Sequence, residues 1–423
     1  MSTVAKPARG AAAPGSGGRW TALPSWARSA IIVAVGVGLL SLTATLTGQI
    51  QLTSSGTAQA AVRLLLPILF AALGGLWAER AGVINIGLEG MLILGTWGAA
   101  WAGYQWGPYA AVVGGLVFGA LGGLLHAVAT VTFGVNHIVS GVAITLLGMG
   151  LTRYLASVVF LPLTQNPRES PPVPAFETFS VQPLADGLRS VESEQRVVLS
   201  DVAGLLGGLL SGLTPLVLLG FALVPISYLV LWRTGFGLRL RSCGENPVAA
   251  ETLGVPVYTY KYLAVIISGG LAGLGGAALT LNPGQLGYQE GQSGGRGYIG
   301  LAAMIFGNWR PGGLLAGSAL FGYTDGVQLR AGGEAVHALL YGASILAVGI
   351  AVMWVARRRW KPALIALVAG LVVYVVYYST ETVPEQFASY APQLVTLLVL
   401  AAASQRLRPP AADGMEYRRG EGD

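Results

Sequence analysis

The sequence predicts an all-α polytopic integral membrane protein with about 10–11 transmembrane helices and one re-entrant or broken helix. Its composition supports this fold class, because 53% of the residues are hydrophobic and only 10% are charged. A soluble domain carries roughly 25% charged residues. Apolar runs also recur along residues 31 to 400, and several exceed the roughly 18 residues that a helix needs to cross a bilayer. One soluble core cannot account for this pattern.

The apolar runs define the expected spans in order along the chain. Residues 297–308 form a run of only about 12 residues, which suits a re-entrant or broken helix better than a full crossing. Many of the 62 glycines lie within spans, where small residues let membrane helices approach closely. The spans are expected near residues 29–47, 60–78, 83–104, 108–133, 138–160, 213–232, 262–281, 311–329, 336–356, 363–380 and 391–404.

Basic residues at the ends of the spans predict the orientation. The net charge is +6, and clusters such as Arg357 to Arg359 fit the excess of Lys and Arg in cytoplasmic loops. No basic stripe with interleaved aromatic residues suggests nucleic-acid binding. We therefore expect both termini in the cytoplasm. The expected layout is a disordered cytoplasmic tail (1–28), a transmembrane domain (29–405) with an extracytoplasmic loop (161–212) and a cytoplasmic loop (234–261), and a cytoplasmic tail (406–423).

Two glycine-interrupted apolar regions lie in the two halves of the chain, at residues 74–90 and 284–313. Interrupted hydrophobic segments in corresponding halves are the best sequence indication of a substrate site in a transporter. We therefore expect these two regions to contribute to such a site.

The first of these regions places an acidic residue at membrane depth. If Glu79 and Arg80 mark the interface, a rise of about 1.5 Å per residue places Glu89 about 15 Å deeper, near the middle of a roughly 30 Å core. An acid there costs about 2.5–3.5 kcal/mol on insertion scales, so it is expected to face a cavity or a polar partner. Asn85 and Glu89 are spaced i, i+4 and would share one face of a helix. Both are candidates for a substrate pathway, and a hydrogen bond between helices is the alternative.

Three stretches carry a family resemblance. Residues 78–90 read A-E-R-A-G-V-I-N-I-G-L-E-G, residues 244–255 read G-E-N-P-V-A-A-E-T-L-G-V, and residues 295–307 read G-R-G-Y-I-G-L-A-A-M-I-F-G. The chain thus resembles the permease subunits of the nucleoside and simple-sugar branch of bacterial ABC importers, within the branched-chain amino acid and ribose-type permease superfamily. It is most similar to the nucleoside permeases with G-V-I-N-I-G-L-E-G. The likeness covers most of residues 60–330 and resumes near 392–410, and it is missing from the N-terminal tail, the 161–212 loop and the apolar pair around 336–380.

The resemblance implies a set of partners and a location. It implies separate ATP-binding cassette ATPase subunits, a second homologous permease, an extracytoplasmic substrate-binding lipoprotein, and a multi-pass position in the lipid of the bacterial inner membrane. It also implies that residues 244–255 are the coupling loop and that residues 295–307 are the re-entrant segment. The regions without the likeness inherit no role from it.

The proposed coupling loop also has a local physical interpretation. Asn246 can cap a short helix with Pro247 at its first position, and Gly254 can end it. Such a helix could dock on an ATPase, or it could simply lie on anionic headgroups. The residues predicted for coupling are Gly244, Glu245, Asn246, Pro247, Ala249, Ala250 and Gly254.

Four more residues are candidates for the substrate pathway, each with a simpler alternative. Asn136 and His137 open an expected span, where a polar anchor is the alternative. Arg296 precedes the re-entrant segment and could bind a polar solute or anchor the loop. Asp325 lies about five residues from Arg330, so it could be shallowly buried at a helix end.

Several chemistries are excluded by motif. No G-x-x-x-x-G-K-[ST] phosphate loop occurs, so the chain should be a non-catalytic transport subunit whose energy comes from ATP on a partner. With a single cysteine, Cys243, and no paired metal-ligand spacing, we expect no metal or other cofactor.

We therefore expect a permease that forms the path for a small polar solute, with a nucleoside as the implied substrate. The alternatives are a simple-sugar permease, an ion-coupled secondary transporter that uses Glu89 or Asp325 as its relay, and a membrane-embedded enzyme, for which no catalytic constellation is visible.

Overall fold

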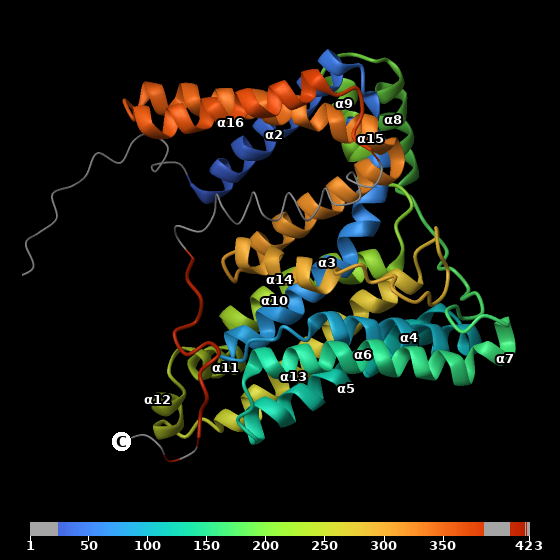
Figure 1. Ribbon diagram of the computed structural model, residues 1–423, viewed down its shortest axis with the longest axis vertical. Coiled ribbons are helices and arrows are strands. Elements are labelled where there is room, and N and C mark those ends of the chain that lie inside the picture. The colour runs from blue at the N-terminus through green and yellow to red at the C-terminus, as the bar shows by residue number, and fades with distance from the viewer. Residues whose placement is uncertain (1–23, 385–406, 419, 421–423) are drawn as a thin grey trace, which may run out of the picture.

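The computed structural model describes residues 24–384, 407–418 and 420, and within them it is built from helices without named strands (Figure 1). In this part of the chain seven helices are long and apolar enough to cross a membrane. A multi-pass all-α membrane protein is thereby confirmed. The seven are α3 (Ser55–Arg80), α5 (Pro108–Ala127) with its π-helical extension η2 (Val128–Thr132), α6 (His137–Val159), α10 (Pro215–Arg233), α13 (Val257–Thr280), α15 (Pro311–Ala356) and α16 (Trp360–Ser379).

The remaining expected spans correspond to two further helices, to a pair that is joined in α15, and to one segment outside the described residues. Helices α2 (Ser25–Thr47) and α4 (Leu88–Trp106) match the first and third expected spans. Helix α15 joins the expected spans 311–329 and 336–356 through a bend at Gly332, whose φ of 61° and ψ of −153° suit glycine alone. Figure 1 shows the two halves diverging there. The expected span 391–404 lies outside the described residues, as does most of the tail 1–28.

The predicted broken helix is confirmed. Residues 282–295 form turns and loops, and the short α14 (Arg296–Phe306) follows them. Asn308 and Trp309, both at φ 52°, then turn the chain into α15.

Helices α3 and α13 form the centre of the molecule, with about four fifths of their apolar windows buried (78% and 83%). The corresponding windows of α6 and α16 are only 28% and 11% buried. Outward apolar surface of this kind faces lipid or other membrane subunits, because exposing so large an apolar area to water is energetically unfavourable.

Glycine permits the closest helix contacts, as expected from the sequence. A Cβ atom added to Gly273 of α13 would lie 2.1 Å from the carbonyl oxygen of Gly115 on α5. A Cβ atom on Gly119 would lie 2.3 Å from the carbonyl oxygen of Gly269. Both separations are far below van der Waals contact, so these backbones touch only because side chains are missing.

The connecting segments collect at two opposite ends of the long helices (Figure 1). Helices α11 (Gly235–Glu245) and α12 (Pro247–Thr252) lie at one end, and α7 (Leu161–Thr164) and α8 (Gln182–Ser193) lie at the other. The 161–212 loop also holds α9 (Leu199–Leu209), and the 3-10 helix η1 (Ile50–Thr53) follows α2. Loops 161–212 and 234–261 therefore lie on different sides, and which side is cytoplasmic stays a prediction.

Candidate functional site

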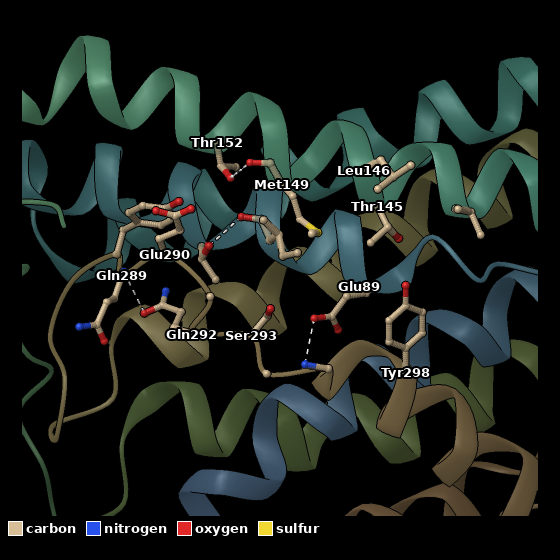
Figure 2. A pocket seen from close by; sticks show the side chains of 17 residues that line it. Glu89, Thr145, Leu146, Met149, Thr152, Gln289, Glu290, Gln292, Ser293 and Tyr298 are labelled. Carbon is tan, nitrogen blue, oxygen red and sulfur yellow. Dashed lines mark hydrogen bonds between the residues drawn. The ribbon is translucent and has the colours of Figure 1, made fainter. Parts of the chain in front are cut away.

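A cavity of about 550 Å³ lies between α4, α6 and the broken-helix segment. Its size is in the range of sites for small molecules. Figure 2 shows α6 along one side and the loop before α14 along the other. The lining residues are Glu89, Ile93, Thr96, Val142, Thr145, Leu146, Met149, Thr152, the loop residues 288–295 and Tyr298.

The cavity is suited to an uncharged polar solute. Its polar side chains are mainly hydroxyls and amides, and Ile93, Leu146 and Met149 supply apolar surface. The two acids in the lining are both engaged. Glu290 pairs with Arg153 and Arg168 at 3.6 and 3.4 Å, and Glu89 is bound by backbone amides.

Glu89 holds the start of α14. Its Oε1 accepts a hydrogen bond from the backbone N–H of Gly295 (3.1 Å), and its Oε2 accepts one from that of Gly297 (2.7 Å). A carboxylate at a helix N-terminus satisfies unpaired N–H groups and interacts favourably with the helix dipole. Gly297 allows this approach, because a Cβ atom there would lie 2.5 Å from the Cα atom of Glu89. The two glycine-interrupted regions therefore meet at Glu89.

The opposite end of α14 is held by Glu79 and Arg80, the charged pair that precedes Glu89 in the motif of residues 78–90. Glu79 accepts a hydrogen bond from the indole N–H of Trp309 (2.5 Å). The Arg80 guanidinium donates two to the Trp309 carbonyl oxygen, at 3.2 Å from Nε and 2.7 Å from Nη2. These bonds offset left-handed backbone at Asn308 and Trp309, which costs on the order of 1–3 kcal/mol per residue. Thus Glu79, Arg80 and Glu89 fix both ends of the broken helix.

Arg296 and Asp325 form an ion pair of 3.3 Å between α14 and α15. Asp325 is 8% exposed, so it is buried and paired, whereas one expectation had placed it shallowly at a helix end. Arg296 also donates to the carbonyl oxygens of Gln292 and Ser293, at 3.5 and 3.3 Å. It therefore braces the loop that lines the cavity.

Asn85 lies in a non-helical turn before α4. Its expected common helix face with Glu89 does not form, because helix α4 begins only at Leu88. The Asn85 amide donates to the hydroxyl of Ser268 (2.9 Å), and its Oδ1 atom is buried without a partner among the described residues.

The pair that opens α6 lies away from the cavity lining. Asn136 is the N-cap of α6 and accepts from the N–H groups of Ile138 and Val139. His137 accepts a hydrogen bond from the N–H of Ile84 at 3.2 Å. Of the six residues predicted for the substrate pathway, Glu89 is the one in the cavity lining.

The short helix predicted in the 234–261 loop is present as α12 (Pro247–Thr252). Asn246 accepts a hydrogen bond from the N–H of Ala249 (3.0 Å), Pro247 is its first residue, and Gly254 follows at φ 79°. Leu253, which follows the helix, is 84% exposed.

The two alanines predicted for coupling differ in exposure. Ala249 is exposed, but Ala250 is 3% exposed and faces the protein interior. The two successive residues point about 100° apart around a helix, and Ala249 is the one that is open to a partner.

The 161–212 segment is hydrogen-bonded to the loop that lines the cavity. The N–H of Ser170 donates to the Tyr288 carbonyl oxygen (3.0 Å), and the N–H of Glu290 donates to that of Arg168 (2.9 Å). Sequence analysis placed the region 284–313 at a substrate site but singled out none of residues 288–293, although the polar residues between apolar spans gave a signal there (Gln289, Glu290, Gln292 and Ser293).

Comparison with known proteins places the chain in a family. Residues 57–349 match the family model described as "Branched-chain amino acid transport system / permease component". This range spans the 161–212 loop and ends within the 336–380 pair. No solved structure matches the chain.

Three relatives illustrate the similarity. The guanosine ABC transporter permease protein NupQ of Bacillus subtilis is 34% identical over 62% of this chain and 78% of its own length. The putative glucose ABC transporter permease protein TsgC13 of Haloferax volcanii is 36% identical over 66% and 78%. The nucleoside ABC transporter permease protein NupC of Lactococcus lactis is 31% identical over 83% and 93%.

The same three organisms each hold a second similar permease, NupP, TsgB13 and NupB, at lower identities of 27%, 27% and 22%. The family match to residues 57–349 covers more than half of the chain, and it agrees with the apolar helices and the broken helix. This protein therefore belongs to the family of permease components of branched-chain amino acid transport systems.

Proposed function

We propose that this chain is the membrane-spanning permease subunit of an ATP-driven importer for nucleosides. The observation that carries the proposal is the cavity between α4, α6 and the broken-helix segment. Its hydroxyl, amide and tyrosine side chains suit an uncharged solute with many hydrogen-bonding groups. Two of the three relatives described above are named as guanosine or nucleoside permeases.

The energy source in this proposal is ATP hydrolysed by separate ATPase subunits. The chain contains no phosphate-binding loop, and α12 offers the exposed side chains of Ala249 and Leu253 to a partner. A second, related permease is the other expected membrane partner, in line with the pairs of similar permeases in three organisms. A substrate-binding lipoprotein would meet the 161–212 side, and the termini and α12 would be cytoplasmic.

Other candidate functions have less support. A relative named as a putative glucose permease favours a sugar as the second candidate substrate. An ion-coupled transporter would need a carboxyl group free to exchange its ion, but Glu89 accepts two amide hydrogen bonds and Asp325 is paired with Arg296.

Uptake in cells with and without the chain tests the substrate. Labelled guanosine, cytidine and glucose are each supplied, and unlabelled competitors are added in turn. Uptake of the nucleosides should depend on the chain and stop when ATP is depleted but the membrane potential is kept. If glucose uptake depends on the chain and nucleoside uptake does not, the substrate is a sugar and the nucleoside proposal is wrong.

Docking of the ATPase is tested by Ala249→Trp, with Ala250→Ser as a buried small-residue control. Overpacking a tight contact costs about 1–3 kcal/mol. ATPase retention during purification and guanosine-stimulated ATP hydrolysis should both fall for Ala249→Trp while binding-protein affinity for solute is unchanged. Normal values for both would exclude α12 as the docking element.

A further inference from the structure

The C-terminal segment, residues 407–417 and here called the strap, runs beside α11 and α12 at one end of the molecule (Figure 1). Its backbone is bound to the end of α11 and to the turn after α3. The N–H of Ala412 donates to the Gly244 carbonyl oxygen (2.9 Å), and that of Gly414 donates to the Gly82 carbonyl oxygen (3.4 Å). Ala412 is only 6% exposed. The strap is therefore a built part of the fold.

The side chains of Tyr417 and Asp413 link the strap to α12 and to the end of α3. The hydroxyl of Tyr417 donates a hydrogen bond to Oε2 of Glu251, on α12, at 2.5 Å. The Tyr417 ring also lies 5.7 Å from the Lys261 ammonium of α13. The carboxyl group of Asp413 is a neighbour of the Glu79 carboxyl group at the end of α3, and it interacts with the charges of Lys261 and Arg80.

The other end of the strap reaches the broken helix. The N–H of Arg408 donates to Oδ1 of Asn308, in the turn after α14, at 2.8 Å. The next residue, Trp309, is the one that Glu79 and Arg80 hold. One short segment thus contacts α12, the end of α3 and the turn after α14. The start of α14 is held by Glu89 beside the cavity.

We infer that Asp413 and Tyr417 are positioning residues, through which the strap carries a displacement of α12 to α14 and so to the cavity. The inference rests on the proposed function, because an ATPase must move α12. The physical reason is that the strap is short and bonded at both ends. A rigid-body shift of α12 therefore pulls on the turn at Asn308. Contact alone does not establish coupling, so the test is a double-mutant cycle.

The experiment uses the full chain in the reconstituted complex, with labelled guanosine as the probe, and measures guanosine transported per ATP hydrolysed. Tyr417→Phe keeps the ring and removes the hydroxyl, and Glu251→Gln removes the charge of its acceptor. Each should lower the ratio about three- to tenfold, because a hydrogen bond to a charged group is lost. The double variant should be no worse than either single variant. Met415→Ala is the matched control, since Met415 is a strap residue that is 59% exposed.

Every outcome decides the inference. The inference is overturned if both single variants transport as much guanosine per ATP hydrolysed as the wild type. If they do so but lose thermal stability, the strap has a purely structural role. Additive losses in the double variant also overturn the inference, because the two groups would then act separately. If the wild-type complex imports guanosine with ATP while the variants match it, the inference alone fails. If the wild-type complex imports none, the proposed function fails and the inference fails with it.

Discussion

Replacement of Glu89 is expected to disturb the cavity through the broken helix, and the structure sets the size of the effect. The carboxylate accepts hydrogen bonds from the N–H groups of Gly295 and Gly297, and Glu89 is only 4% exposed. Glu89→Leu leaves both amides without their acceptor at a cost of about 1–3 kcal/mol each, or about 2–6 kcal/mol together. Glu89→Gln keeps one acceptor oxygen and should cost about half as much.

The assay compares thermal stability of the purified chain with guanosine uptake at equal expression. Stability should decrease in the order wild type, Glu89→Gln, Glu89→Leu, and uptake should follow the same order. Glu290→Gln is the matched control, because it removes an acid from the same cavity without touching α14. Unchanged stability and uptake in Glu89→Leu would refute this reasoning. Full stability of Glu89→Gln with no uptake would show that the charge itself acts on the solute.

Further predictions address packing, orientation and pH. Gly297→Ala places a methyl group 2.5 Å from the Cα atom of Glu89, so it should lower uptake and stability, whereas Gly312→Ala, with open space around it, should change neither. Cysteines at Ser193 and Arg358 should be labelled from opposite sides by an impermeant thiol reagent, with only position 193 reacting in intact cells, and labelling of both there would reject the orientation. Native Cys243 should stay silent in that assay, because burial raises the pKa of its thiol to about 11 and keeps it protonated; rapid labelling of the wild-type chain at neutral pH would contradict this. Burial also raises the pKa of Asp413 to about 7, against the opposing effects of Glu79, Lys261 and Arg80. The docked strap thus holds a proton that the free segment has already released, so docking should weaken as pH rises through about 7, and cleavage within the strap by a protease of broad specificity should become faster. Asp413→Asn should abolish this pH dependence, and equal cleavage rates at pH 6 and 8 in the wild type would exclude it.

The sequence by itself determined the fold class and most spans, because lipid requires long apolar helices whose backbone groups are satisfied internally. It also determined α12, whose ends are fixed by Asn246, Pro247 and Gly254 within a few residues. Glycine spacing likewise predicted close helix packing, and the short run at 297–308 predicted the broken helix. These features depend on local chemistry or on length, and both can be read along the chain.

Only the tertiary structure decided what the candidate residues do. Glu89 caps a helix whose N–H groups lie 206 and 208 positions away in the sequence, and no local pattern encodes such a pairing. Asn85 does not share a helix with Glu89, because α4 begins only at Leu88. Ala250 is buried within the protein. The cavity is lined by three segments distant in sequence. Which polar groups face it depends on how α4, α6 and the broken helix pack in space, since helix packing in lipid is set by shape complementarity between segments.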